Sequence, residues 1–381
     1  MALRWRDAMS TALYGPDGFF VSGAGPAAHF RTSVHASPVF ASCLSRLLVS
    51  LDAALGHPAR FDIVDVGAGR GELLRSLALA VGATTAGARP SPSGPASAGA
   101  LSTAPVPLAQ RVRLVAVEKA SRPEDLPAEI EWMDEIPQGL TGLLVGTEWL
   151  DNVPLDLAVN TPGGWRYLLV DPATGEESTG DPVDVEDGSW LDQWWPAPAP
   201  APAPASIKKF ASGMGPGSDA NFLINGVGGR GEVGRSRDEA WAAAVTHLDR
   251  GVALAVDYGH LREDRPIGGT LTGYRGGRQV APVPDGSCDV TAHVAMDSVA
   301  AAGERVARCA YTLVSQREGL RALGADGGRP PLSLASRDPA GYVRALAAAS
   351  AVAELTDPAG LGGHWWLLQP VGVALDPLMA R

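Results

Sequence analysis

Apolar residues recur with two periods along the chain, and helical and extended stretches alternate. Phe40 begins a series of apolar positions at helical spacing that ends at Leu55, which predicts a helix with one apolar face. The run Phe61–Val66 that follows is typical of a buried strand, and Glu72–Val81 is typical of a helix. The first part of the chain therefore predicts a helix, a strand and a second helix in that order.

Three more short apolar runs have the composition of interior strands in a parallel sheet. They are Arg111–Glu118, Gly142–Gly146 and Gly251–Asp257. Ser236 and Glu239 have the spacing of a capping box, which predicts a helix over Arg237–Leu248 ahead of the last strand. Strands that alternate with helices predict an α/β fold with an open, doubly wound and mostly parallel sheet.

Two pairs of apolar runs predict antiparallel strands instead. Leu155–Val159 and Trp165–Val170 flank a Thr-Pro-Gly-Gly turn and predict a β-hairpin, which is foreign to a plain doubly wound sheet. Cys309–Ser315 and His364–Gln369 are predicted to pair at one edge of the main sheet, with a helix over Gly341–Leu355 between them. The chain therefore predicts a parallel sheet with an antiparallel edge and a small inserted lobe.

Composition and charge exclude several classes of function. The 381 residues carry 31 Lys and Arg against 42 Asp and Glu, and the formal charge of −11 disfavours binding to nucleic acid or to an anionic membrane. No run approaches the ~18 apolar residues of a membrane-spanning helix, and Met1–Leu13 lacks the apolar core of a secretory signal. Histidine and cysteine are scattered. We expect a cytoplasmic protein with no metal site and no membrane insertion.

The strongest chemical signal is a GxGxG turn between a predicted strand and a predicted helix. Gly67, Gly69 and Gly71 let backbone amides approach a ligand where a Cβ atom would clash. Asp65 precedes this turn and Glu72 follows it, and two carboxylates there would repel a pyrophosphate but suit a sulfonium and an amino group. The pattern favours S-adenosylmethionine (SAM) over a dinucleotide, and a purely structural turn is the other alternative.

Glu118 stands where a nucleotide-binding fold places the carboxylate that holds the ribose hydroxyls. It ends the second predicted strand, 47 residues after Gly71, whereas the usual distance is about 20 residues. If the low-complexity stretch Gly82–Ala109 is a surface insertion of 28 residues, 19 residues remain. We therefore predict that Glu118 holds the ribose.

A set of motifs occurs in one order over nearly the whole chain. They are Leu13–Phe20, Phe30–Ser33 with Ser37–Phe40, Gly67–Gly71, Glu148–Pro154 (EWLDNVP), Asp257–Gly259, Gly269–Leu271 with Tyr274–Arg275, Asp289–Val294 and Ser315–Glu318. In these motifs the chain resembles the MidA family of SAM-dependent methyltransferases. That family includes the mitochondrial complex I assembly factor that methylates arginine in a protein subunit.

The resemblance implies a class I SAM-methyltransferase fold, which is Rossmann-like, with the three glycines facing the methionine part of SAM. Asp134 falls where such folds contact the adenine. The chain then divides into a helical N-terminal segment packing over the cofactor site (1–60), a SAM-binding half (61–154) with a flexible insertion (82–110), an inserted substrate lobe (155–235) with a Pro/Ala-rich loop (196–217), and a C-terminal half (236–381).

Carboxylates at the predicted strand ends are the candidate catalytic groups. Glu148 and Asp151 follow one strand and Asp257 ends another, at the edge where open α/β sheets bind ligands. A carboxylate there would hold a guanidinium and accept a proton as the nitrogen attacks. The alternatives are that Glu148 and Asp151 cap the next helix and that Asp257 bonds its own turn.

Thr32, Ser33 and His293 are predicted to contact the substrate, and a structural role is the alternative for His293. His29 and His35 replace carboxylates that the family usually has, which weakens the case for arginine, a permanent cation, as acceptor. We predict a SAM-dependent methyltransferase with a protein substrate, and a homodimer is compatible with the sequence. The alternatives are a non-catalytic assembly or scaffolding protein and a nicotinamide-dependent oxidoreductase.

Overall fold

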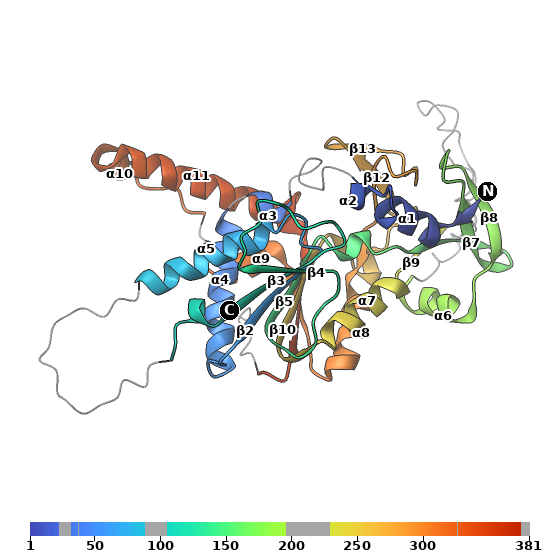
Figure 1. Cartoon of the computed structure of the whole chain (residues 1–381). Helices are drawn as coiled ribbons and strands as arrows, with labels where there is room; N and C mark the ends of the chain where they lie inside the picture. Colours follow the sequence, from blue (N-terminus) through green and yellow to red (C-terminus); the bar gives the residue numbers. More distant parts are fainter. Residues whose placement is uncertain (23–31, 37, 88–104, 196–228, 326, 375–381) are drawn as a thin grey trace, which may run out of the picture. The chain divides into compact units, whose positions relative to one another are not determined.

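The computed structural model describes residues 1–22, 32–36, 38–87, 105–195, 229–325 and 327–374 (Figure 1). The chain forms two compact units. The core unit consists of Ala24–Leu150, Trp241–Tyr258 and Ala300–Arg381, and the accessory unit of Met1–Gly23, Asp151–Ala240 and Gly259–Val299. The accessory unit thus contains the lobe predicted over 155–235 together with two further stretches of the chain. The predicted N-terminal segment, 1–60, is divided between the units.

A seven-stranded sheet forms the centre of the core unit, in the order β16, β17, β10, β5, β2, β3 and β4. The strands are β2 (Phe61–Val66), β3 (Val112–Val117), β4 (Ile130–Met133), β5 (Leu140–Thr147), β10 (Leu248–Asp257), β16 (Thr312–Ser315) and β17 (Trp365–Val371). β17 pairs in antiparallel fashion with β10 and β16, and the other pairs are parallel. The predicted mostly parallel sheet with an antiparallel edge is confirmed.

The order of the strands determines where a ligand can bind. From β2 the chain moves outward through β3 and β4, and then returns to the other side of β2 with β5 and β10. The strand order therefore reverses between β2 and β5. Open parallel sheets bind ligands at such a reversal, outside the carboxyl ends of the strands. The loops after β2 and β5 carry the glycine turn and the motif Glu148–Pro154.

Helices pack against this sheet and carry most of the apolar core. α4 (Pro38–Ala54) and α5 (Glu72–Gly87) lie side by side against it (Figure 1), and leucines on both helices are fully buried. The unit also contains the helices α3 (Ser33–Ala36), α9 (Gln316–Ala322), α10 (Leu332–Arg337) and α11 (Pro339–Leu355), and the short 3-10 helices η2 (Leu108–Gln110) and η5 (Leu361–Gly363). The helices predicted at Phe40–Leu55 and Gly341–Leu355 are confirmed.

One boundary in this unit was predicted wrongly. α5 begins at Glu72 as expected, but it continues to Gly87, six residues into the stretch 82–110 that the sequence predicted as a flexible insertion. Alanine favours helix, and no proline stops the helix before Pro90. Near the other end of that stretch Leu108 is buried in the core. The residues in between, 88–104, lie outside the part of the chain that the structure describes.

A buried ion pair joins α4 to the start of β3. Both terminal nitrogens of Arg111 donate to the Asp52 carboxylate, at 2.9 and 2.7 Å, and His57 Nδ1 lies 2.8 Å from it. Burial raises the pKa of Asp52, but the bonds with Arg111 and His57 outweigh this effect, and the pKa lies below its usual value. The folded core unit therefore stabilises the ionised form of Asp52.

This ion pair predicts an acid-sensitive stability. Because the folded pKa is lowered, the contribution of Asp52 is fully present above the unfolded value of about 3.9 and is lost as the pH falls through the folded value. We expect Asp52→Asn to destabilise the protein at neutral pH and the difference from wild type to shrink below about pH 4. The midpoint of urea unfolding at a series of pH values measures this, and a difference in midpoint that stays constant with pH would contradict it.

The accessory unit contains three small sheets. In the first, β1 (Leu3–Arg4), β7 (Gly164–Val170), β6 (Asp156–Thr161) and β9 (Arg230–Val233) follow one another and β8 (Glu177–Pro182) pairs with β7. β13 (Arg278–Val280), β12 (Thr272–Arg275) and β14 (Asp289–Thr291) form the second, and β11 (Gly259–His260) with β15 (Val294–Ala295) the third. The predicted hairpin is confirmed, because β6 and β7 pair up to Thr161 and Gly164, with Pro162 and Gly163 at the turn.

Helices complete the accessory unit. They are α1 (Trp5–Tyr14), α2 (Phe19–Ser22), α6 (Val185–Trp194) and the 3-10 helix η4 (Arg262–Asp264). The apolar face of α1 packs against strands β6, β7 and β14 through residues such as Trp5 and Met9. The Pro/Ala-rich loop predicted over 196–217 lies outside the described residues. Within the described residues, no helix has the length and apolar character that crossing a membrane requires.

Three elements contain a unit boundary, namely η3 (Leu150–Asn152), α7 (Arg235–Val245) and α8 (Met296–Ala307). The capping box predicted for α7 was wrong. The helix begins at Arg235, so Ser236 lies inside it, and its hydroxyl donates to the carbonyl of Pro154 at 2.6 Å. Ser236 thus bonds to a carbonyl distant in sequence and not to Glu239 or its neighbours, as the capping-box spacing suggested. The helix ends at Val245, and β10 begins at Leu248.

Candidate functional site

The glycine turn after β2 has a backbone that only glycine adopts easily. Gly67, Gly69 and Gly71 have φ values of 72°, 57° and 81°, in the left-handed region. A Cβ atom on Gly71 would lie 2.6 Å from Leu126 Cδ1, so a larger residue would also clash. The Gly67 amide donates to the Val117 carbonyl at 3.0 Å, which ties the turn to the end of β3.

Glu118 lies directly at this turn. Its Oε2 accepts a hydrogen bond from the Gly69 amide at 3.0 Å, and its Oε1 accepts from the amides of Lys119 and Ala120 at 2.7 and 3.1 Å. The structure thus brings together the acidic residue and the glycine turn, although Glu118 lies 47 positions after Gly71. Asp134 follows the adjacent strand β4 and is exposed, and it lies at the same edge of the sheet because the Glu118 backbone amide donates to the Met133 carbonyl at 2.9 Å. Their contacts with ribose and adenine stay predictions.

Asp65, in β2, is a buried carboxylate with an unsatisfied oxygen. Its side chain is 2% exposed, and Oδ1 has no hydrogen-bond partner among the described residues. Burial raises the pKa of Asp65 well above its usual value, and the charges of Glu72 and Glu118 raise it further. A buried polar atom without a partner calls for one. A positively charged amino group at this end of β2 would supply it.

Glu148 follows the last residue of β5 and has an unusual backbone. Its φ is 50°, which lies in the left-handed region. This conformation is unfavourable for any residue that has a Cβ atom. Its amide donates to the Val256 carbonyl at 2.8 Å, and its Oε1 accepts from the Ser33 amide at 3.2 Å. The predicted catalytic residue Glu148 and the predicted substrate residue Ser33 therefore meet.

Ser33 begins α3 and is fully buried, and the neighbouring Thr32 is 9% exposed. The Ser33 hydroxyl donates to Gln316 Oε1 at 3.0 Å. Gln316 is also buried, and it accepts from Trp366 Nε1 at 3.2 Å. These bonds let Ser33 position the Glu148 carboxylate from within the core unit. Gln316 was not predicted as a site residue, although it belongs to the motif Ser315–Glu318.

Asp257 ends β10 and makes two bonds to backbone amides. Oδ2 accepts from Leu150 at 2.9 Å and Oδ1 accepts from Tyr258 at 3.0 Å. The side chain is 1% exposed. These contacts match the turn role that the sequence left as an alternative. They also connect Asp257 to the loop of Glu148, and its catalytic role stays a prediction.

In the accessory unit, Asp151 and the motif Asp289–Val294 meet in the interior. Thr291 Oγ1 donates to Asp151 Oδ2 at 2.7 Å, and Asn152 Nδ2 donates to Asp289 Oδ1 at 2.7 Å. Burial raises the pKa of Asp289 well above its usual value, and the charge of Asp151 raises it further, against the bond from Asn152. Asp289 therefore becomes neutral at a higher pH than an exposed aspartate does.

Arg237 connects these two segments and was not predicted. Its guanidinium is buried and donates to backbone carbonyls of Val153 at 3.1 Å and of Ala292 and His293 at 2.9 Å each, and it also donates to the Asp151 carbonyl. In sequence Arg237 stands beside a charged helix start and resembles a surface residue. Its partners are carbonyls, which no sequence motif reveals.

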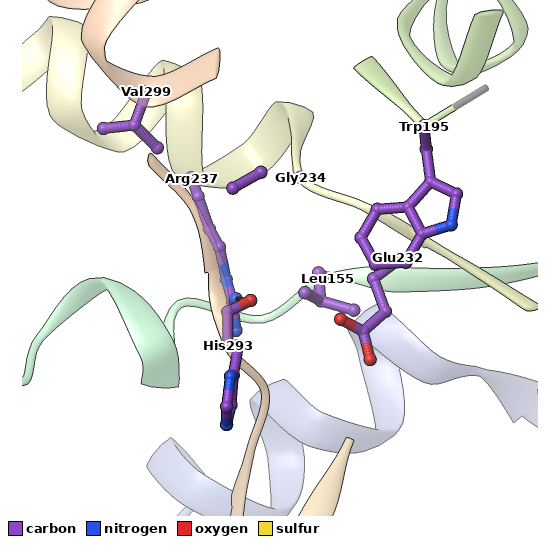
Figure 2. A pocket seen from close by; sticks show the side chains of 8 residues that line it. Leu155, Trp195, Glu232, Gly234, Arg237, His293 and Val299 are labelled. Atoms are coloured by element: carbon purple, nitrogen blue, oxygen red, sulfur yellow. Dashed lines mark hydrogen bonds between the residues drawn. The ribbon is translucent and has the colours of Figure 1, made fainter. Parts of the chain in front are cut away.

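His293 is one of the residues that line a small pocket in the accessory unit (Figure 2). The pocket is lined by Leu155, Trp195, Glu232, Gly234, Arg237, His293, Ala295 and Val299. The His293 amide donates to Thr270 Oγ1 at 2.8 Å, and Thr270 Oγ1 donates to Glu232 Oε2 at 2.7 Å. The exposed His293 ring stacks on His260, 6.3 Å away, and burial followed by the charge of Arg265 lowers the pKa of His260 to about 3. His260 is therefore neutral near pH 7.

Some predicted positions lie outside this description. His29 is not among the described residues, and the side chain of His35 is not described, although its backbone belongs to α3. Among the residues that the structure describes, no group of three or more His, Cys, Asp and Glu side chains is arranged to hold a metal ion.

Comparison with known proteins identifies the family of the chain and its cofactor. Residues 43–313 match the family described as "Putative S-adenosyl-L-methionine-dependent methyltransferase". The chain belongs to this family. The match includes the glycine turn, Glu118 and Glu148, and it confirms SAM as the cofactor class predicted from the carboxylates around the turn. The unsatisfied, buried oxygen of Asp65 fits the amino group of that cofactor.

Two solved structures from Burkholderia thailandensis are similar to the whole chain. One is a COG1565 superfamily member bound to S-adenosyl-homocysteine (SAH), with 23% identity and a TM-score of 0.71 over 100% of this chain and 91% of that chain. The other is a native structure of a COG1565 superfamily protein, with 22% identity and a TM-score of 0.69 over 100% and 90% of the two chains. At these identities the likeness shows the fold, which is that of a SAM methyltransferase. No curated protein matches the chain.

The state of Asp65 predicts proton release when SAM binds. An ammonium group beside Asp65 favours the carboxylate, so binding at a pH below the raised pKa should release a proton. Calorimetry in buffers of different ionisation enthalpy, between about pH 5 and about pH 8, measures this release. Asp65→Asn should abolish it and weaken SAM binding, whereas the exposed Asp134→Asn should leave the proton count unchanged. Equal proton counts in wild type and Asp65→Asn would contradict the assignment.

Proposed function

We propose that the protein is a methyltransferase of the MidA type that transfers the methyl group of SAM to a protein side chain, with arginine as the acceptor. The geometry of Glu148 is the observation that carries this proposal. The residue stands at the carboxyl end of β5, with a φ of 50° and its carboxylate bonded to the Ser33 amide. Such a left-handed conformation costs about 1–3 kcal/mol and is enriched at functional sites, and His57 and Arg308 also adopt it in this chain.

SAM supplies a methyl carbon that the acceptor nitrogen attacks while the electron pair of the broken C–S bond goes to sulfur, which yields SAH. Asp65, the three glycines and Glu118 would hold the cofactor at the turn after β2. Glu148 would orient the guanidinium and accept the proton that its nitrogen loses. No covalent enzyme intermediate is needed, so the contribution of the protein is alignment and charge.

The charge of the chain supports a cationic acceptor. The formal charge of −11 favours the approach of a basic protein segment over an acidic one. A guanidinium stays protonated at any physiological pH, so it needs a carboxylate partner to lose a proton during attack. Glu148 would supply such a group at the carboxyl end of β5.

Labelled SAM tests this proposal directly. The purified protein is incubated with methyl-labelled SAM and with extracts of cells that lack its gene, and the labelled proteins are hydrolysed to resolve methylated arginines. We expect label in methylarginine. Label in another residue would overturn arginine as acceptor while retaining protein methylation. A protein that binds SAM but labels no extract would favour the scaffolding alternative.

A further inference from the structure

Trp149 lies where the carboxyl ends of β2 and β5 meet. A Cβ atom on Gly67, which follows β2, would be 3.3 Å from Trp149 Cδ1. A Cβ atom on Gly146, near the end of β5, would be 2.9 Å from Trp149 Cε3. The indole therefore packs directly on the backbone of both strand ends. These two strands flank the reversal in strand order at which a parallel sheet binds ligands.

The exposure of Trp149 differs from that of a core tryptophan. Trp241 and Trp366 in the same unit are completely buried, whereas Trp149 is only half-buried. The indole lies against two glycines, Gly67 and Gly146, and a side chain at either position would press on it. The sequence thus provides space for a large aromatic ring at the reversal and leaves part of that ring open.

The charges around the glycine turn suit a cation beside this ring. Asp65, Glu72 and Glu118 place three carboxylates at the turn, and burial, followed by the charges of Glu72 and Glu118, raises the pKa of Asp65. The face of a tryptophan ring attracts cations, most strongly where water is excluded. SAM carries a sulfonium cation, whereas its product SAH has a neutral sulfur. An aromatic ring beside the sulfur would therefore bind SAM more tightly than SAH.

We propose that Trp149 binds the sulfonium-bearing part of SAM through its indole face and makes the site prefer SAM over SAH. The inference rests on the SAM cofactor of the proposed function and adds a specificity-determining residue to it. Weaker binding of SAH favours release of the product after each transfer. A cation–aromatic contact at a partly desolvated site predicts a preference of about two-fold to about thirty-fold.

Calorimetry with SAM and SAH tests the proposal without any turnover. For Trp149→Leu we expect the affinity for SAM to fall at least about five-fold more than the affinity for SAH. Trp149→Phe keeps an aromatic face and should retain most of the preference. Trp194→Leu, a half-buried tryptophan in the accessory unit, is the matched control and should leave both affinities unchanged. An equal change for both ligands in Trp149→Leu would overturn the proposal.

Fluorescence gives a second readout that does not depend on the leucine variant folding. The chain has ten tryptophans, and we expect SAM to quench emission in wild type and in Trp194→Phe but far less in Trp149→Phe. Undiminished quenching in Trp149→Phe would overturn the contact. A wild-type protein that binds neither SAM nor SAH would overturn the cofactor itself. A wild-type protein that binds both, with a preference for SAM that Trp149→Leu leaves unchanged, would overturn only the role of Trp149.

Discussion

Replacing Glu148 by Gln is expected to lower kcat for methyl transfer by about 10²–10⁴-fold and to change the Kd for SAM little. Glutamine has the size of glutamate, and its carbonyl oxygen can still accept from the Ser33 amide, so the loop after β5 should keep its shape. It cannot accept a proton at neutral pH and does not attract a guanidinium as a carboxylate does. Single-turnover transfer of labelled methyl measures the rate, and calorimetry measures the affinity.

Glu131→Gln is the matched control for this experiment. Glu131 lies in β4 of the same unit and bonds to Arg113 at 2.6 Å in a largely exposed ion pair, which contributes little to stability. This variant should transfer methyl groups at the wild-type rate. A wild-type rate in Glu148→Gln would contradict the catalytic assignment. A loss of SAM affinity as large as the loss of rate would give Glu148 a role in binding the cofactor instead.

Replacing Arg237 by Met is expected to lower the free energy of local opening in the interior of the accessory unit by at least about 3 kcal/mol. Methionine fills much of the same volume, but it removes the guanidinium that donates to the carbonyls of Val153, Ala292 and His293. A buried acceptor that loses its partner costs about 1–3 kcal/mol. Because the chain has two units, a single free energy of unfolding is not well defined.

Hydrogen exchange at single amides is therefore the appropriate measurement for Arg237. The Ala292 amide donates to the Asp151 carbonyl and lies inside the affected region, so its protection should fall in Arg237→Met. Arg237→Lys retains some of the hydrogen-bond donors, so the protection of Ala292 in this variant should lie between the wild-type value and the Arg237→Met value. Arg278→Met, at an exposed position in the same unit, is the control and should change nothing. Unchanged protection of Ala292 in Arg237→Met would contradict the bracing role.

Elements with a strong local pattern could be predicted closely. The apolar spacing from Phe40 to Leu55 forms α4, and the strand predicted at Phe61–Val66 has the same bounds in the structure. The hairpin of β6 and β7 forms around its Pro-Gly turn. In each case residues close in sequence determine the conformation, because helical and extended periods place the apolar side chains on one face.

Features that depend on distant partners could not be predicted in this way. Ser236 had the spacing of a helix cap, but its hydroxyl bonds to Pro154, which is 82 positions away. The six extra residues of α5 occupy a stretch whose composition indicated a loop. Gln316 and Arg237 make their contacts with residues from other parts of the chain. Hydrogen bonds of this kind have no period along the sequence.

The sequence by itself determined the mostly parallel sheet, the glycine turn and the carboxylate after the second strand, because strand periodicity and the conformational freedom of glycine are local properties. It also indicated the family through motifs that are short and ordered. Only the tertiary structure decided that Ser33 contacts Glu148, that Asp65 Oδ1 is buried without a partner among the described residues, and that Trp149 packs on Gly67 and Gly146. Burial and contact between distant residues arise from packing, and a linear pattern does not encode them one residue at a time.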